Sequence, residues 1–223
     1  MAWDSIWEEI FKQQAWGKYP GEDVIRFVAR NFYRAEVRSD IKILEVGCGT
    51  GANLWYMANE GFTVYGIDGS ETAIKTATAR LDADVKGWKG ELAVGDITNL
   101  SYPDGFFDAV IDVGAVCCNS FENAQKIYNE MARVTKKGGK MFSRTFATGS
   151  WGDGTGEKVG HNAYMVTEGP LANRGYNRFT ELSEIPSLIE GYKLTEIELQ
   201  TRTFEGRTKD FKEWVIIGEK VVD

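Results

Sequence analysis

Residues 41–53 constrain the fold more than any other part of the chain, because an apolar run leads directly into three closely spaced glycines. The apolar positions are Ile41, Ile43, Leu44 and Val46, a pattern typical of a strand buried on both faces. The glycines that follow are Gly47, Gly49 and Gly51. Glycine has no Cβ, so the main chain of such a turn approaches a bound ligand closely. The junction therefore predicts a nucleotide-like ligand at the end of a buried strand.

Beyond this turn, strand-like and helix-like segments alternate, which favours a parallel sheet covered by helices on both faces. The expected strands are 41–46, 62–67, 91–94, 107–113 and 139–146. One helix is expected to start at an N-cap at Ser70, and a second covers 121–135 and ends at a C-cap signal, Gly138-Gly139. Near the C-terminus, a short helix near 181–190 precedes the segments 193–204 and 209–218, which we expect to pair as an antiparallel hairpin.

The spacing of the glycines distinguishes two kinds of cofactor. Dinucleotide enzymes use Gly-x-Gly-x-x-Gly, which receives a pyrophosphate, whereas here the third glycine comes one residue early. Glu45 adds a carboxylate two residues before Gly47, where it repels a pyrophosphate but is able to hold a cationic group. Acid-x-Gly-x-Gly-x-Gly resembles motif I of the class I S-adenosylmethionine (SAM) dependent methyltransferases. The cofactor of that family has an amine, a carboxylate and a sulfonium but no phosphate.

This resemblance implies a Rossmann-like α/β fold, with a seven-stranded, mostly parallel sheet whose last strand is antiparallel. It covers residues 40–146 by motif and the remainder by layout only. We expect one domain over 1–223, with an N-terminal helical cap over 1–35 and an acceptor-binding lid over 147–180.

The resemblance also implies cofactor-binding residues at the carboxyl ends of the strands, where ligands of open parallel sheets collect. Asp68 matches the acid that accepts hydrogen bonds from both ribose hydroxyls. Asp96 matches the acid that receives the adenine amino group, with Ile97 on the ring, and Asp112 lies beside the methionine part. The alternative for each acid is a turn or N-cap role. The full predicted set is Trp16, Tyr19, Glu45, Gly47, Cys48, Gly49, Gly51, Asn53, Asp68, Gly69, Asp96, Ile97 and Asp112.

Aromatic residues near the N-terminus are candidates for contact with the cofactor cation, at about 0.5–2 kcal/mol per contact. Trp3, Ile6, Trp7, Ile10 and Phe11 follow helical spacing. A turn that contains Trp16 and Tyr19 leads to a second helix over 22–33. In related enzymes such a segment caps the pocket, so Trp16 and Tyr19 are the expected contacts. The alternative is that the aromatics only pack the helix on the core, which we favour for Trp3 and Trp7.

The acceptor must be recognised mostly by residues 147–180, a long glycine-rich connection of a kind that is uncommon in compact domains unless it is functional. Predicted substrate-binding residues are Arg144, Trp151, Tyr164 and Arg178. Aromatic faces and hydrogen-bonding groups suit a hydroxylated or carboxylated acceptor, such as a sugar. Arg144 is alternatively a structural ion-pair partner. His161, the only histidine, is the candidate base for an oxygen acceptor, and its alternative is a structural or exposed loop residue.

Composition narrows the partners. A net charge of -7 and a pI near 5.0 make nucleic acid an unlikely partner. The sequence after the fourth strand also lacks the two prolines that amino-nucleobase methyltransferases carry there. The three cysteines are Cys48, Cys117 and Cys118, which suggest a reducing compartment. The adjacent pair is expected to be structural because strand neighbours point to opposite faces, and its alternative is thiol chemistry or arsenic binding. With no signal peptide or apolar span recognised, we expect a cytoplasmic protein without membrane insertion or a metal site.

The sequence thus predicts a SAM-dependent methyltransferase that acts on a small-molecule or glycan-like acceptor, at oxygen. Two other classes stay open. A nicotinamide-dependent oxidoreductase uses a similar sheet but is disfavoured by the glycine spacing and Asp96. A non-catalytic SAM-binding protein would bind the cofactor without turnover. The acceptor and the oligomeric state are left open.

Overall fold

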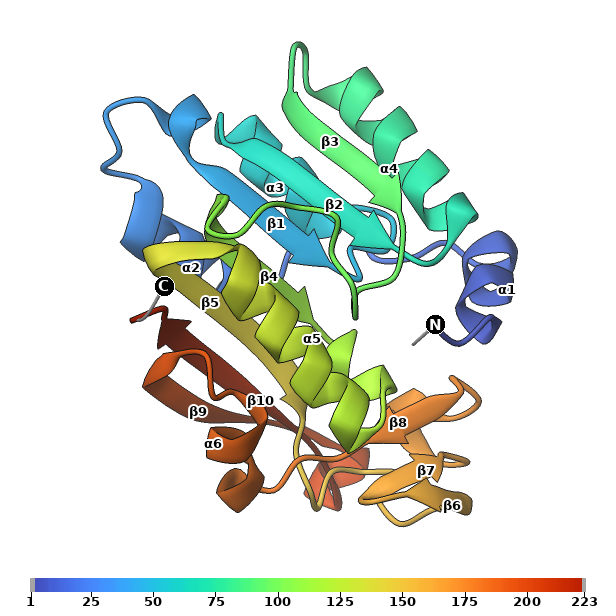
Figure 1. Cartoon of the computed structure of the whole chain (residues 1–223). Helices are drawn as coiled ribbons and strands as arrows, with labels where there is room; N and C mark the ends of the chain where they lie inside the picture. The colour runs from blue at the N-terminus through green and yellow to red at the C-terminus, as the bar shows by residue number, and fades with distance from the viewer. Residues whose placement is uncertain (1–2, 222–223) are drawn as a thin grey trace.

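The computed structural model describes residues 3–221, and its centre is a seven-stranded sheet in the order β3-β2-β1-β4-β5-β10-β9 (Figure 1). The strands are β1 (Lys42–Val46), β2 (Thr63–Asp68), β3 (Lys89–Val94), β4 (Phe107–Val113), β5 (Thr135–Phe146), β9 (Lys193–Phe204) and β10 (Lys209–Glu219). Strands β1 to β5 pair in parallel, and β10 runs antiparallel to both of its neighbours, β5 and β9. The predicted mostly parallel sheet with an antiparallel last strand is confirmed.

Helices cover both faces of this sheet, as predicted. They are α2 (Glu22–Phe32), α3 (Ala52–Asn59) and α4 (Glu71–Asp84) on one face, and α5 (Phe121–Val134) and α6 (Ile185–Leu188) on the other. Alternate side chains of β1 take part in both layers, because Ile43 packs with Leu54 of α3 while Leu44 packs with Ile127 of α5. This two-sided burial explains the unbroken apolar run in β1.

Local signals position most of these elements correctly. Ser70 caps α4 as predicted, and its Oγ accepts a hydrogen bond from the backbone N–H of Ala73 at 3.0 Å. The predicted C-cap at Gly138-Gly139 is wrong. Helix α5 ends at Val134 and β5 begins at the next residue, so Gly138 lies inside the strand, where its N–H donates to the carbonyl of Lys220 at 2.8 Å. The short helix expected over 181–190 is a turn of 3-10 helix at Leu182–Glu184 followed by α6.

Residues 147–180 contain regular structure rather than a plain loop. They form a second, three-stranded antiparallel sheet of β6 (Glu157–Gly160), β7 (Ala163–Met165) and β8 (Tyr176–Arg178). Short strands of this kind carry little local signal, and this sheet packs on side chains from distant elements, Phe146 of β5 and Phe211 of β10. The small sheet lies beyond the carboxyl ends of the central strands (Figure 1).

Helix α1 (Ile6–Gln13) lies near the same edge, beside the start of α4 (Figure 1). Its Glu8 accepts hydrogen bonds from the hydroxyls of Ser70 at 2.5 Å and Thr72 at 2.6 Å, and these bonds lower the pKa of Glu8 to about 2.

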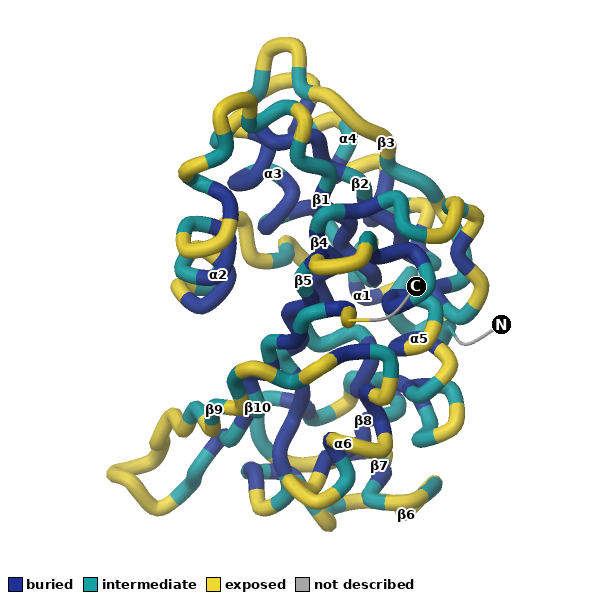
Figure 2. Tube along the Cα trace, turned by 60° about the vertical axis from the view of Figure 1, so that its left-hand side comes forward, coloured by how far each residue is buried: buried dark blue, intermediate teal, exposed yellow. Residues whose placement is uncertain are grey.

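Near the C-terminus, the tip of the β9–β10 hairpin, residues 201–208, is exposed (Figure 2). No helix within residues 3–221 has the length and apolarity needed to cross a bilayer.

Candidate functional site

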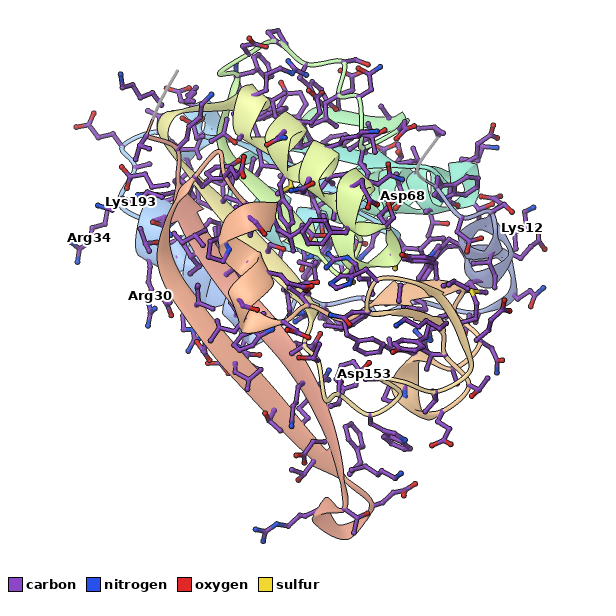
Figure 3. All side chains as sticks on the ribbon, turned by 60° about the horizontal axis from the view of Figure 1, so that its bottom comes forward. Lys12, Arg30, Arg34, Asp68, Asp153 and Lys193 are labelled. Carbon is purple, nitrogen blue, oxygen red and sulfur yellow. The ribbon has the colours of Figure 1, made fainter. Side chains whose placement is uncertain are left out.

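A cavity of about 250 Å³ opens at the carboxyl edge of the central sheet. Its floor comes from the glycine turn after β1, the end of β2, the residues after β3 and the loop after β4, and its roof from the N-terminal segment. Asp68, at the end of β2, lies on the side of the molecule where α1 carries Lys12, whereas Arg30, Arg34 and Lys193 lie on the opposite side (Figure 3). The positive charges of Arg30, Arg34 and Lys193 are therefore remote from Asp68.

Most of the predicted cofactor-binding residues meet at this cavity. Those that line it are Trp16, Tyr19, Glu45, Gly47, Cys48, Gly49, Asn53, Asp68, Gly69, Asp96 and Ile97. They come from separate segments of the chain, so the parallel topology has brought the carboxyl ends of β1, β2 and β3 together.

The three glycines of the turn all have left-handed backbone, with φ of +63° at Gly47, +52° at Gly49 and +79° at Gly51. A Cβ on Gly47 would lie 2.2 Å from the Cβ of Ala115, so only glycine fits there. Gly51 differs from the prediction because it does not line the cavity. A Cβ at Gly51 would lie 2.8 Å from the Cβ of Ala77, so this glycine instead permits close packing of the turn on α4.

Asp68 is only 6% exposed, and both of its carboxylate oxygens accept main-chain hydrogen bonds. Oδ2 accepts from the N–H of Gly49 at 2.9 Å, and Oδ1 accepts from the N–H of Ser70 at 2.9 Å. Burial raises the pKa of Asp68, while these two hydrogen bonds oppose that shift. Since a carboxylate has about four acceptor sites, Asp68 retains acceptor capacity towards the cavity.

Glu45 is a buried acid of the cavity with one unpaired oxygen within residues 3–221. Oε1 accepts a hydrogen bond from Nδ2 of Asn53 at 2.5 Å, while Oε2 is buried with no hydrogen-bond partner in the described part of the chain. Burial raises the pKa of Glu45 to about 8, and the nearby carboxylates of Asp112 and Asp68 add to the shift. An unsatisfied buried acceptor is costly, so Glu45 fits a ligand that brings a cation or an N–H donor to Oε2.

Asp96 and Ile97 follow β3 and line the cavity together, as predicted. Oδ1 of Asp96 accepts hydrogen bonds from the backbone N–H of Thr98 at 3.0 Å and from its hydroxyl at 2.7 Å. These bonds hold the carboxylate at the start of the loop after β3, where Asp96 is partly exposed and Ile97 is buried.

Asp112 does not contact the cavity, contrary to the prediction. It is fully buried, and its Oδ1 accepts hydrogen bonds from the N–H groups of Ala115 at 2.9 Å and Val116 at 3.0 Å. Its Oδ2 accepts from the hydroxyl of Ser143 at 2.7 Å. Asp112 therefore shapes the loop after β4, and residues further along that loop, Cys118 and Asn119, line the cavity instead. The sequence analysis assigned neither of them to the cavity.

Aromatic side chains form much of the roof. Trp7 and Phe11 of α1 each pack edge-on against Trp16, with ring centroids 5.7 Å apart in both pairs. Trp3 lies over Gly69, where an added Cβ would approach the indole ring to 2.3 Å. Trp3, Trp7 and Phe11 all line the cavity, so the interpretation that Trp3 and Trp7 only pack the helix is wrong. Tyr19, 72% exposed, lies at the margin.

Of the predicted substrate-binding residues, only Arg144 lines the cavity. Its guanidinium pairs with Asp23 at 3.0 Å and with Glu213 at 3.4 Å. Its position is therefore compatible both with substrate binding and with a structural ion-pair role, because the ion pairs hold the guanidinium at the wall of the cavity.

The other predicted acceptor residues lie elsewhere. Trp151 packs on Phe204 with ring centroids 5.8 Å apart, and Tyr164 packs in the small sheet. Arg178 is fully buried and donates to the hydroxyl of Thr180 at 3.0 Å. The side chain of His161 is 63% exposed and pairs with Glu184 away from the cavity. This position does not fit the predicted role of His161 as the base.

Comparison with known proteins agrees with this geometry. Residues 44–143 match the family model described as a methyltransferase domain. The chain is 29% identical over 127 residues to norajmaline N-methyltransferase of Rauvolfia serpentina, covering 56% of this chain and 42% of that protein. It is 30% identical over 139 residues to a sterol 24-C-methyltransferase of Neurospora crassa, covering 59% and 34%. The chain thus spans less than half the length of these two curated relatives.

A solved SAM-dependent methyltransferase from Methanosarcina mazei has the same fold, with a TM-score of 0.68, 18% identity, and coverage of 88% of this chain and 98% of that one. The family match begins in β1 and continues through the glycine turn, Asp68 and Asp96 into β5. The sheet order and the register of the motifs agree with this match, so residues 44–143 form a methyltransferase domain similar to those of the class I SAM-dependent methyltransferases, a family whose methyl donor is SAM.

Proposed function

We propose that this protein transfers the methyl group of SAM to an oxygen atom of a small, polar, sugar-like acceptor. The observation that carries the proposal is the aromatic roof. Trp3, Trp7, Phe11 and Trp16 cover a cavity of about 250 Å³, which favours a small molecule over a polymer as the group that enters.

The cofactor supplies an electrophilic methyl group on a sulfonium. We assign Asp68 to the ribose hydroxyls and Asp96 to the adenine amino group, because both residues line the cavity at the ends of neighbouring strands. Glu45 is assigned to the cationic end of the cofactor because its Oε2 has no hydrogen-bond partner among residues 3–221. The aromatic faces of the roof stabilise a cation in the cavity and exclude water from it.

The acceptor side of the cavity carries Arg144, Asn119 and Cys118. Arg144 and Asn119 both donate hydrogen bonds, so they suit an acceptor with hydroxyl or carboxylate oxygens. An in-line displacement depends mainly on orientation, which is worth roughly 7–11 kcal/mol in well-aligned systems. The proposal therefore assigns no base and no role in catalysis to His161.

The charge of the cavity supports the small-molecule class. The cavity is lined by four acids, Asp4, Glu45, Asp68 and Asp96, against a single arginine, which disfavours a nucleic acid backbone. The two curated relatives are named for nitrogen and carbon acceptors, so methylation at oxygen rests on Arg144 and Asn119.

We further propose that residues 147–180 form the outer part of the acceptor site within one domain over 1–223. The small sheet packs on Cys117, next to the cavity-lining Cys118, which supports a position beside the acceptor. We retain the cytoplasm as the proposed location because all three cysteines are free thiols, which a reducing compartment maintains.

The test is an acceptor screen with SAM labelled in the methyl group, read by mass spectrometry. Sugars, phenols and small carboxylates are compared with amines, each with the wild-type protein and Asp68→Ala as a cofactor-binding control. The proposal expects labelled product in the oxygen classes, lost in the variant, with the methyl carbon assigned by NMR as an ether or ester. Transfer only to nitrogen or carbon would refute the oxygen assignment. Tight SAM binding without turnover of any acceptor would favour the non-catalytic alternative.

A further inference from the structure

Cys117 and Cys118 do not lie on a strand, and their thiols do not diverge. They belong to a turn of 3-10 helix at Val116–Cys118 after β4. Neighbouring side chains on such a turn are about 120° apart, rather than on opposite faces. Sγ of Cys117 lies 3.3 Å from the carbonyl oxygen of Gly114, and Sγ of Cys118 lies 3.5 Å from the same atom. The two thiols therefore converge, contrary to the expectation from the sequence.

This dithiol, Cys117 and Cys118, connects the cavity with the small sheet. Cys118 lines the cavity, as does Gly114, the residue that both thiols contact. Cys117 is fully buried in the apolar cluster under the small sheet. A ligand in the cavity thus lies next to one of the two cysteines, and the second is the adjacent residue.

A buried cation lies next to the dithiol. Arg178 is fully buried, and its Nε and Nη2 have no hydrogen-bond partner within residues 3–221. Burial raises the pKa of Cys117, and the guanidinium of Arg178 opposes that shift. This positive charge stabilises negative charge that develops on sulfur when a thiol loses its proton.

The geometry disfavours the two commonest fates of paired cysteines. Adjacent Cα atoms are about 3.8 Å apart, whereas disulfides usually need about 4.4–6.8 Å, so a bond between these sulfurs would strain the main chain. Zinc takes four ligands in structural sites, and no group of three or more metal-binding side chains occurs in the described range 3–221. A thiophilic atom that takes two sulfurs close together, with its third bond to another group, meets neither obstacle.

We propose that Cys117 and Cys118 form a dithiol site for a trivalent arsenical that enters from the cavity. The arsenical class is an organoarsenous acid, with one carbon and two hydroxyls on arsenic. Two S–H bonds and two As–O bonds break, two As–S bonds form, and two water molecules leave. Arsenic stays trivalent and neither sulfur is oxidised, so no oxidant is needed. The organic group then lies on the cavity side, next to Cys118.

The probe is phenylarsine oxide at a stoichiometric amount, with intact mass spectrometry and a count of free thiols. We expect one adduct that consumes two thiols, withstands excess glutathione and is removed by 2,3-dimercaptopropanol. Two sulfurs on one atom give an advantage of roughly a hundredfold or more over one. Cys118→Ser should therefore weaken retention by about that factor, and so should Cys117→Ser. Cys48→Ser, which changes the remaining cysteine, should retain the wild-type behaviour.

Cys118 is partly exposed, so its variant tests the site even if the more buried Cys117→Ser fails to fold. Thermal melting checks that each variant is folded. An adduct that survives glutathione in folded Cys118→Ser would overturn the proposal, as would an adduct that consumes one thiol. S-adenosylhomocysteine, which occupies the cavity, should slow labelling of the wild type. An unchanged labelling rate at saturation would refute entry from the cavity.

Discussion

The unpaired Oε2 of Glu45 should make binding of SAM depend on pH, and one substitution should remove that dependence. Oε2 is buried without a hydrogen-bond partner within the described residues, and the pKa of Glu45 is raised to about 8, chiefly by burial. A cation placed at Oε2 favours the ionised carboxylate, so binding should release a proton when it starts from protonated Glu45. The variant Glu45→Gln keeps an amide oxygen that accepts from Asn53 but cannot ionise.

The size of the effect follows from the pKa near 8. About one molecule in a hundred has Glu45 ionised at pH 6, about one in ten at pH 7, and about nine in ten at pH 9. If SAM binds the ionised form, its Kd should fall about tenfold from pH 6 to pH 7 and level off above pH 9. For the protein without ligand, the free energy of unfolding changes with pH in the opposite direction to the affinity for SAM. The folded state retains a proton that the unfolded chain loses near pH 4.5, so its stability falls as pH rises from 4.5 through 8.

The assay is isothermal titration calorimetry of SAM across this pH range, in buffers of different ionisation enthalpy. Proton release from Glu45 appears as a buffer-dependent heat at pH 7, and Glu45→Gln should lose that part of the heat and of the pH dependence. The ligand's own amino group titrates in both proteins, so the difference between them isolates Glu45. Equal pH profiles for wild type and a folded Glu45→Gln would refute the assignment of Glu45 to the cationic end of the cofactor.

Three further predictions concern other residues of the site. Asp68→Ala should weaken SAM binding by about a hundredfold or more through loss of two charged hydrogen bonds, and unchanged affinity by calorimetry in a folded variant would exclude the ribose role. His161→Ala should leave turnover nearly unchanged, because His161 lies outside the cavity. A fall of about a hundredfold in a radiolabel transfer assay, the effect of removing a general base, would contradict this. Gly47→Ala should destabilise the protein by more than the roughly 1–2 kcal/mol of left-handed strain, because its Cβ would also clash at 2.2 Å. Gly114→Ala is the matched control for urea denaturation, since its φ is +78° but the space around it is open. Equal losses in the two variants would show that the clash is relieved.

Much of the cofactor side was predictable from the sequence because its signals are local. The glycine turn carries its own backbone requirement, and Ser70 carries its own capping group. Asp68 is the last residue of β2 and Asp96 comes shortly after β3, so the parallel sheet brings both to one edge. The predicted C-cap is wrong because the backbone N–H of Gly138 donates to the carbonyl of Lys220, a residue far along the chain, and not to the end of α5.

The acceptor side was not predictable, since its geometry depends on packing between distant segments. Asp112 follows the same strand-end rule as Asp68, yet hydrogen bonds to Ser143 and the β4 loop keep it out of the cavity. His161 is held away by Glu184. The small sheet forms on Phe146 and Phe211, which no local pattern connects with its short strands.

By itself, the sequence determined the order of elements, the glycine turn and hence the resemblance to SAM-dependent methyltransferases. These properties depend on periodicity, caps and backbone conformation, which act over a few residues. Only the tertiary structure decided which side chains meet at the cavity. It brought Trp3 and Trp7 into the roof, kept His161 out, and turned Cys117 and Cys118 towards one oxygen. The physical reason is that contacts between distant segments are selected by packing, which carries no short-range signature in the chain.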